Sequence, residues 1–458
     1  MKNNKLKLSW EDIGSLDPIS STKTALHIIF RTNVYDCLFK RSKNGLIKPQ
    51  LCTNWKYINE NLLEIDLKND VKFHNGKLFN SESIEYTFNK LKNSNMNLLY
   101  DSIENIKVIN KNKINIILNK HDTSLIPNLT LLPMLTPADY SEPIGTGPYR
   151  FDNYKEGDYL NLISNEKYWN GIPFIKNILY LCCNDPYIRY ENLLSDNVDL
   201  IFQPPHENIE SLKNNYEIME INGPDTIVIS INCKKTYFEK NVRKAISYAI
   251  DREKIINNVL LNHAIVPKSV LSPPVFGYNN NLDDVKCDLL KAKQLINLTK
   301  YKGGFECSLI LPQGAIPKLL ETASIVKDSL SKLDISVNIL DYPEKKAWPL
   351  MSDGKYEMFM NGWSEITLDP DYNLKSNFLS NNRENLDNDI LFNLINNAKN
   401  IIDEEKRKSA YHKIQVILMD LQSRIPIYHA KDVWVCKKNI KFTPRQDRLI
   451  ELKDIKLI

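Results

Sequence analysis

Alternating apolar and polar positions predict strands and hairpins over the first half of the chain. The stretch LLEIDLK (62–68) has the two-residue period of a strand with one buried face. KVIN and KINIILN (113–119) flank a short polar turn, and YRFDNY and YLNLIS do the same, so each pair predicts a β-hairpin. SESIEYTFNKLKN (81–93) predicts a helix that starts on a serine cap, with one apolar face formed by Ile84, Phe88 and Leu91.

Helical periods dominate the second half. The segment 242–260 predicts a single amphipathic helix whose buried side carries Val242, Ile246, Ala249, Ile250 and Ile256. FECSLIL (305–311) and ISVNILD (335–341) flank a further helical stretch, and this order predicts two parallel strands joined by a helix. Two helices are expected over 388–423, followed by a strand over IPIYHAKDVWVC (425–436). We expect the seam between the two halves near Asn222-Gly223-Pro224.

Length and charge narrow the class of protein. A chain of 458 residues is too long for one hydrophobic core, so two or three lobes are expected. Its 60 Lys and Arg against 56 Asp and Glu leave a net charge of +4 that is spread along the chain, which argues against nucleic-acid binding. No apolar run approaches the roughly 20 residues of a membrane helix.

The eight cysteines have no metal-binding spacing. None forms a CxxC pair, and Cys182 and Cys183 are adjacent, so they would point to opposite faces of a strand. We therefore expect free thiols that fill core positions.

A glycine-rich stretch, GTGPY (145–149), invites comparison with phosphate-binding loops. Such a loop needs successive backbone N–H donors that open onto a helix, whereas Pro148 removes a donor and a strand follows. We interpret GTGPY as a turn into a strand. HExxH, GxSxG and Walker motifs are missing as well, and this argues against an enzyme.

Six segments in a fixed order carry a family resemblance. They are LDPISS (16–21), VYDCLF (34–39), the stretch from LCTNWKY to FNKL (51–91), the stretch from IGTGPYRF to WNGIP (144–173), VRKAISYAIDREKII (242–256) and GWSEITLDPDY (362–372). This order resembles the family 5 solute-binding proteins of ABC transporters, which capture peptides, nickel chelates and related solutes. The resemblance covers nearly the whole chain.

The resemblance implies an α/β fold, the two-lobe periplasmic-binding-protein-like fold (class II) with an extra peripheral subdomain on the first lobe. Lobe I would comprise residues 1–36, 147–225 and 431–458, its peripheral subdomain 37–146, and lobe II 226–430. GTGPY and His74 would then be parts of the scaffold. The family is extracytoplasmic, in the periplasm or at the cell surface as a lipoprotein, so we expect an export signal that this sequence does not include.

Peptide-binding relatives pair the peptide's amino terminus with an Asp three residues after the tryptophan of the GW motif. Here that position is Ile366, and an alkyl group cannot offset a buried ammonium. Glu365 is one residue away and could replace the Asp if the loop shifts. Peptide capture is therefore the alternative, and a nickel chelate is the preferred cargo.

Nickel favours imidazole ligands. Of the seven histidines, the resemblance places His27 and His429 in segments that line the cleft, so we assign both as metal ligands. His412 lies in a charged helix, and His121, His206 and His263 lie in loops, where surface positions are expected. Because a ligating imidazole must be neutral, binding should weaken as the pH falls through about 6.5.

The chelator's carboxylates would need a cation and an apolar wall. The stretch NSNMNLLYDS (93–102) lacks the arginines that nickel-binding relatives use, so Arg383 is the candidate clamp. Trp363 and Tyr100 would supply aromatic walls.

The sequence thus predicts a monomeric binding protein and no enzyme. It would deliver a nickel ion, chelated by a histidine-like ligand, to a cognate ABC permease and its ATPase subunits. A peptide-sensing or chaperone-like interaction protein with the same fold is the rival from another class.

Overall fold

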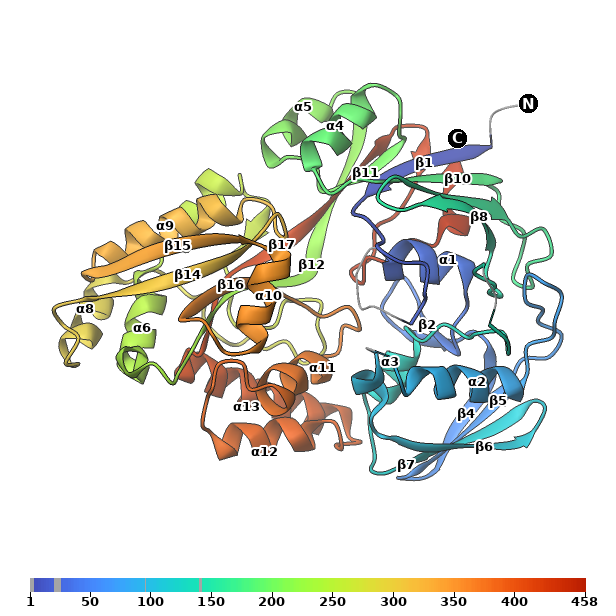
Figure 1. The fold of residues 1–458 in the computed structure, drawn as a ribbon, viewed down its shortest axis with the longest axis horizontal. Helices are drawn as coiled ribbons and strands as arrows, with labels where there is room; N and C mark the ends of the chain where they lie inside the picture. Colours follow the sequence, from blue (N-terminus) through green and yellow to red (C-terminus); the bar gives the residue numbers. More distant parts are fainter. Residues whose placement is uncertain (1–3, 20–25, 95, 140–141) are drawn as a thin grey trace. The chain divides into compact units, whose positions relative to one another are not determined.

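The chain divides into two compact units. The computed structural model describes residues 4–19, 26–94, 96–139 and 142–458, with the backbone alone for 26–28. One unit comprises Met1–Ile221 with Val433–Ile458, and the other comprises Asn222–Asp432. The chain passes between them within two long strands, β12 (Tyr216–Ile231) and β17 (Arg424–Lys437). The seam expected at Asn222-Gly223-Pro224 therefore lies inside a strand and not in a linker (Figure 1).

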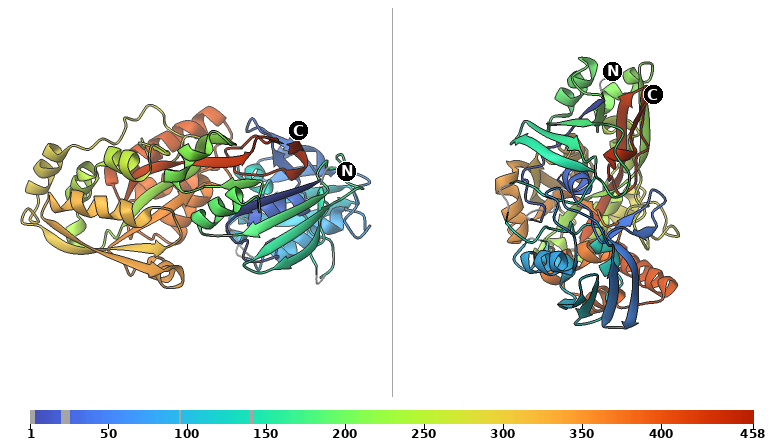
Figure 2. Two further views of the ribbon diagram at one scale, coloured as in Figure 1. Left: turned by 90° about the horizontal axis from the view of Figure 1, so that it is seen from above. Right: turned by 90° about the vertical axis from the view of Figure 1, so that its right-hand side faces the viewer.

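Unit 1 (Met1–Ile221 with Val433–Ile458) is built on a mixed sheet. Its strands follow the order β11-β1-β10-β9-β8, and the end of β17 pairs with β11. The strands are β1 (Lys5–Trp10), β8 (Tyr149–Lys155), β9 (Tyr159–Ser164), β10 (Asn177–Cys182) and β11 (Leu200–Phe202). β1 and β10 are parallel, whereas β8 and β9 form the predicted hairpin. The right-hand view in Figure 2 shows these strands at the same end of unit 1 as the C-terminus.

A second, smaller sheet in unit 1 falls in the segment expected to be the peripheral subdomain. Its order is β4-β5-β7-β6, and helix α2 lies across it in Figure 1. The elements are β4 (Cys52–Asn59), β5 (Leu62–Leu67), α2 (Ser81–Leu91), β6 (Ile103–Asn110) and β7 (Lys113–Leu118). Asn80, and not the expected Ser81, caps α2, because its side chain accepts a hydrogen bond from the backbone N–H of Glu82.

Short elements complete unit 1. They are η1 (Leu26–Arg31), α1 (Thr32–Val34), β2 (Phe39–Arg41), β3 (Ile47–Pro49), η2 (Asn97–Tyr100), α3 (Leu125–Leu129), α4 (Pro186–Leu194), η3 (His206–Asn208), α5 (Ile209–Leu212), β18 (Ile440–Lys441), η7 (Leu452–Asp454) and β19 (Lys456–Leu457).

Unit 2 (Asn222–Asp432) has a sheet of order β15-β14-β16-β12-β17, with β13 paired to β17. Its strands are β12, β13 (Ala264–Ile265), β14 (Phe305–Gln313), β15 (Ile335–Pro343), β16 (Met358–Ser364) and β17. β14 and β15 are parallel and joined by α9 (Leu319–Ser331), as predicted. Apolar residues fill both faces, since one core cluster packs beneath the helices around β14 and another beneath the last helices of the unit.

The helix expected over 242–260 is wrong in extent. α6 (Lys240–Ala249) ends because Ile250 adopts an extended backbone, and Asp251 then caps a new turn by accepting a hydrogen bond from the N–H of Lys254. The other helical elements of unit 2 are η4 (Thr236–Phe238), α7 (Arg252–Lys254), η5 (Ile255–Val259), α8 (Leu289–Asn297), α10 (Glu344–Ser352), α11 (Asp371–Leu374), η6 (Lys375–Ser380), α12 (Asp389–Ala398) and α13 (Glu404–Leu421).

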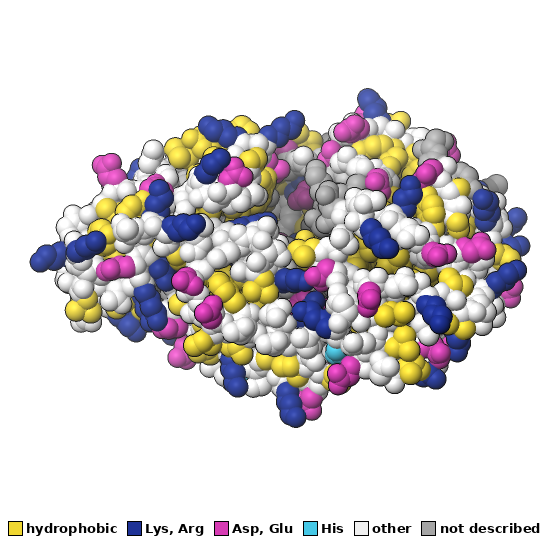
Figure 3. Space-filling view, turned by 60° about the horizontal axis from the view of Figure 1, so that its bottom comes forward, with side chains coloured by type: hydrophobic (Ala, Val, Ile, Leu, Met, Phe, Trp, Pro, Cys, Tyr) yellow, Lys and Arg dark blue, Asp and Glu magenta, His cyan; other side chains and the backbone are white. Residues whose placement is uncertain are grey.

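The surface charges, the cysteines and the helices can each be compared with what the sequence predicted. On the face drawn in Figure 3, basic and acidic side chains are interspersed. The eight cysteines are all free thiols, but the core positions expected for them are wrong for most, since only Cys52, Cys307 and Cys436 are buried and Cys287 is exposed. Within the described part of the chain, no helix is long and apolar enough to cross a membrane.

The two glycines of GTGPY are required by a close approach of two backbones. A Cβ at Gly145 would lie 2.0 Å from the carbonyl oxygen of Val34, and one at Gly147 would lie 2.6 Å from that of Asn33. His74 fixes the same turn, because its Nδ1 accepts from the Gly145 N–H at 3.3 Å and its Nε2 donates to the Gly147 carbonyl at 3.0 Å. The stretch is therefore scaffold, and the glycines are needed for lack of space and not for an unusual turn conformation.

We predict that Gly145→Ala destabilises the protein by at least about 3 kcal/mol, because the backbone it would strike cannot move aside as a side chain could. Gly303→Ala is the matched control, since nothing lies within 4 Å of its added Cβ, and it should change stability by less than about 0.5 kcal/mol. Urea unfolding of both variants measures this. Equal stabilities would contradict the packing argument.

Candidate functional site

Three strands of unit 2 bring a threonine, a tryptophan and a histidine to one face of its sheet. Thr226 on β12 lies opposite Trp363 on β16, so their side chains share a face. His429 on the adjacent β17 joins them through a 2.8 Å hydrogen bond between its Nδ1 and Thr226 Oγ1. The ring of Tyr278 meets the imidazole edge-on, with centroids 6.1 Å apart.

His429 is neutral because of its burial. The residue is 1% exposed, and desolvation lowers the pKa of its imidazole to about 3. While Nδ1 is held by Thr226, the buried Nε2 has no hydrogen-bond partner among the described residues. The imidazole therefore has one ring nitrogen, Nδ1, in a hydrogen bond, whereas the other, Nε2, is without one among the described residues.

The indole of Trp363 contacts two ionisable residues, Glu365 at its ring nitrogen and Arg424 on its face. Its indole Nε1 donates to Glu365 Oε1 at 2.6 Å. The guanidinium carbon of Arg424 lies 4.5 Å from the centre of the ring, within the range of a cation–π interaction. Both partners are buried, so the indole is fixed at its edge and on its face.

The loop after the last turn of η6 positions two opposite charges. Asn382 and Asn385 have left-handed φ angles of 36° and 49°, a conformation that asparagine tolerates better than most residues. Asn382 braces the loop, since its side chain accepts from the Leu386 N–H at 2.9 Å and donates to the Leu386 carbonyl at 2.7 Å. Arg383 and Glu384 between these asparagines are thereby held in place.

Two arginines of this cluster share the side-chain oxygen of Asn377, and only one of them is paired with a carboxylate. Arg424 Nε donates to Glu384 Oε1 at 2.7 Å, and these side chains are only 1% and 0% exposed. Asn377 Oδ1 accepts from Arg424 Nη2 at 2.8 Å and from Arg383 Nη1 at 3.3 Å. Burial, and then the neighbouring Arg424, lower the pKa of the half-buried Arg383. Glu384 therefore balances Arg424, and the charge of Arg383 is left in excess.

Glu365 supports Trp363 from a second cluster of charges. Burial raises the pKa of its carboxyl well above its usual range, and nearby Asp369 and Asp371 add to this. Arg407 neutralises Asp369, with Nη2 lying 2.8 Å from both carboxylate oxygens. Glu365 is thus an internal hydrogen-bond acceptor for the indole.

The structure brings together four of the six residues assigned from the sequence: Trp363, Glu365, Arg383 and His429 all belong to the cluster just described. Tyr100 lies in unit 1, where its ring is 2% exposed and its hydroxyl donates to the Asn128 carbonyl at 2.8 Å. The backbone of His27 lies in η1, and its side chain is outside the described residues.

Other histidines have structural surroundings. His121, expected at the surface, is buried instead, and its Nδ1 donates to the Glu60 carbonyl at 2.9 Å. His412 lies partly exposed on α13. Burial lowers the pKa of His74 to about 4, in keeping with its place beneath the glycine turn.

Sequence reasoning missed Thr226, Asn377, Glu384 and Arg424. None belongs to a recognisable motif, and Arg424 and Glu384 are 40 residues apart. The hydrophobic stretch around Arg424 was the only available signal, because an arginine inside a buried strand must find partners.

Comparisons with known proteins agree over most of the chain. Residues 47–385 match the family model of bacterial extracellular solute-binding proteins, family 5 Middle. Heme-binding protein A of Haemophilus influenzae is 25% identical over 446 residues, which cover 87% of this chain and 82% of that protein. Nickel-binding protein NikA of Staphylococcus aureus is 25% identical over 447 residues, 91% of this chain and 88% of that protein.

A solved structure confirms the predicted two-lobe fold. The periplasmic binding protein DppA of Helicobacter pylori, in complex with the peptide STSA, superposes with a TM-score of 0.86 at 22% identity, covering 99% of this chain and 98% of that one. The similar proteins bind heme, nickel or peptide, and all are binding proteins and not enzymes. The chain belongs to the bacterial extracellular solute-binding proteins of family 5, and it is the solute-binding component of an ABC importer.

Proposed function

We propose that the cargo is a nickel chelate, nickel–histidine being the first candidate, and that His429 is a protein ligand of the metal. The observation that carries the proposal is the state of His429: a buried, neutral imidazole with Nδ1 fixed by Thr226 and Nε2 uncommitted.

This arrangement suits a metal ligand. With the ring proton on Nδ1 donating to Thr226, the lone pair of Nε2 is directed away from that bond and available to a metal. Nickel among divalent metals is well matched to imidazole nitrogen. A single imidazole satisfies only one coordination position, so a small chelator would supply the remaining donor atoms. This is why a chelate and not a bare ion is proposed.

Arg383 and Trp363 would recognise the chelator. The excess charge of Arg383 is desolvated, and a planar guanidinium forms paired hydrogen bonds with a carboxylate. The indole of Trp363, fixed by Glu365 and Arg424, would offer a rigid apolar wall. His27 and Tyr100 remain proposed ligand-binding residues on the sequence resemblance alone.

Peptide capture is the second candidate because a similar structure holds a peptide. The residues at the position that would receive the peptide's amino terminus argue against peptide capture by this chain. Ile366 offers no charge, and Glu365 is buried with its Oε1 bonded to Trp363. Burial disfavours ionisation of Glu365, so it is poorly suited to neutralise an ammonium.

The protein would act as an extracytoplasmic monomer, in the periplasm or as a surface lipoprotein, and would deliver the chelate to its permease and ATPase subunits. Family 5 proteins work with such subunits.

We predict that His429→Ala weakens binding of nickel with histidine by at least about 100-fold, since losing a ligand should cost no less than losing the groups that orient it. His27→Ala should have a comparable effect, and the double variant should cost little more than either single one if the pair acts as a unit. Titration calorimetry with nickel and a fixed excess of histidine measures this.

His412→Ala is the control for that series and should bind like the parent. Arg383→Gln should weaken binding by about tenfold or more, because it removes a charged hydrogen bond to the chelator. If His429→Ala binds nickel–histidine as tightly as the parent, the metal assignment is wrong.

Peptides provide a separate prediction. Di- to pentapeptides should leave the Tm unchanged, because Ile366 offers no charge for their amino terminus and the neighbouring Glu365 is bonded to Trp363. Binding at about 100 times Kd would add about 2.7 kcal/mol, which thermal unfolding detects readily. A clear rise in Tm with a peptide pool would restore the peptide alternative, and Glu365→Gln would then show whether Glu365 is the partner.

The neutral state of His429 can be tested through stability. Because the folded-state pKa is about 3, the unfolded chain takes up this proton first, near pH 6.5, so folding stability falls as the pH drops from about 6.5 towards 3. His429→Asn keeps a hydrogen-bonding group for Thr226 and cannot titrate, so its Tm should fall less steeply over that window. An equally steep fall would show that the ring is not buried in the neutral form. The same pKa means that a loss of nickel binding near pH 6.5 would not come from protonation of His429.

A further inference from the structure

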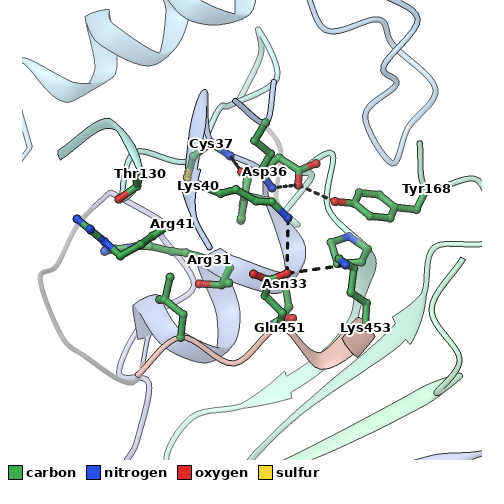
Figure 4. A pocket seen from close by; sticks show the side chains of 15 residues that line it. Arg31, Asn33, Asp36, Cys37, Lys40, Arg41, Thr130, Tyr168, Glu451 and Lys453 are labelled. Atoms are coloured by element: carbon green, nitrogen blue, oxygen red, sulfur yellow. Dashed lines mark hydrogen bonds and ion pairs between the residues drawn. The ribbon is translucent and has the colours of Figure 1, made fainter. Parts of the chain in front are cut away.

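Basic side chains outside the cargo site differ in whether a carboxylate is paired with them. In the pocket of unit 1 drawn in Figure 4, the ammonium nitrogens of Lys40 and Lys453 lie 3.8 Å from Glu451 Oε2. Lys453 Nζ also lies 2.6 Å from Asp454 Oδ1. The lysines of this pocket are therefore paired within the protein, whereas several lysines around helix α8 of unit 2 are not.

The segment 286–304, which includes α8, has a surplus of positive charge. It contains five lysines and one acidic residue, Asp288, and so a surplus of four positive charges. Asp288 caps the helix, because its Oδ1 accepts a hydrogen bond from the backbone N–H of Lys291 at 2.9 Å. Helix α6, which packs against α8, contains no acidic residue. Among the described residues, no ion pair is formed by four of the lysines, Lys286, Lys293, Lys300 and Lys302.

The exposed face of α8 has two leucines with lysines on either side. Leu290 and Leu298 are 78% and 75% exposed, whereas the opposite face of the helix is buried. At about 100° per residue, these leucines lie about 80° apart around the helix axis, and Lys291 and Lys293 flank them. Lys291 Nζ lies 4.2 Å from the centre of the Tyr248 ring, a contact that leaves its charge in place.

An anionic lipid surface matches this arrangement. Lysines close to such a surface are attracted by the lipid phosphates. Leucines that stand among them can enter the boundary between the headgroups and the acyl chains, as in helices that lie in the plane of a membrane. In Figure 1, α8 lies at the end of unit 2 that is farthest from β12 and β17, the strands along which the chain leaves the unit. A bilayer can therefore reach α8 without covering those strands.

We propose that α8 and the segment that follows it form a contact surface for an anionic lipid bilayer. The lysines bind the lipid phosphates, and Leu290 and Leu298 enter the interface beneath the headgroups. The contact is peripheral, and no part of the chain has to span the bilayer. The proposal rests on the residues of α8 and 299–302, so it is independent of the nickel assignment around His429.

Vesicle flotation of the full chain tests the proposal. Vesicles of equal parts phosphatidylglycerol and phosphatidylcholine should carry the protein with them, whereas vesicles of phosphatidylcholine alone should not. Raising the salt concentration from about 0.1 M to about 1 M should release the protein, because the Debye length falls from about 10 Å to about 3 Å. Lys293→Gln/Lys302→Gln should weaken binding to the anionic vesicles by about tenfold or more. Leu290→Ser/Leu298→Ser should weaken it by a similar factor at unchanged charge.

Matched variants of the β6–β7 hairpin in unit 1 are the controls. Lys107→Gln/Lys111→Gln removes two exposed lysines, and it should bind anionic vesicles like the parent. Val108→Ser/Ile109→Ser removes two apolar side chains that are 40% and 45% exposed, and it should also bind like the parent. Each change is at the surface, so the Tm of every variant should stay close to that of the parent.

The proposal is overturned if the parent does not bind anionic vesicles, if either α8 variant binds them like the parent, or if the hairpin variants lose binding to the same extent. Binding of polyglutamate without binding of anionic vesicles would show that the lysines recognise an acidic polypeptide, and this result would overturn the lipid assignment as well.

Discussion

Arg424 and Glu384 form an ion pair that is almost completely withdrawn from water. Removing one partner of such a pair costs roughly 3–5 kcal/mol, because the other charge is left buried without compensation. The pair connects β17 to the loop that carries Arg383. It also places the Arg424 guanidinium over Trp363 and on Asn377, so the indole and Arg383 both take their positions from it.

Burial and the pairing of charges also set the protonation states of the other residues in this cluster. Glu384 pairs with Arg424 while burial lowers the pKa of Arg383, and burial of His429 keeps its imidazole neutral. Neither property belongs to the residue type alone, since an arginine or histidine at the surface would be hydrated and would show its ordinary pKa.

Related proteins bind heme, nickel or peptide on one fold, so the fold does not select the cargo. Selection has to come from the side chains of the binding site. In this chain the position of the expected aspartate is alkyl, and the adjacent Glu365 serves the indole. Neither residue therefore offers a free carboxylate.

The sequence determined most of the local structure and the family. The hairpins, the β14–α9–β15 unit and the last two helices follow from periodicity, because side-chain burial repeats with the period of the element. The helix expected over 242–260 was wrong in extent, because Asp251 caps a new helical turn within it. The glycines of GTGPY were expected to allow a turn, whereas the structure requires them because the backbone of Val34 lies too close for a side chain. The sequence also singled out Trp363 and Glu365 from the GW motif, Arg383 from the loop that follows, and His429 from its place on a strand beside the expected cleft. Tertiary structure alone decided the surroundings of those residues. Thr226 and Arg424 are distant in sequence from the residues that they contact, and Glu384, although next to Arg383, is paired with Arg424 only in the fold. Burial, hydrogen bonding and charge balance are properties of that assembly, so no local pattern in the chain could contain them.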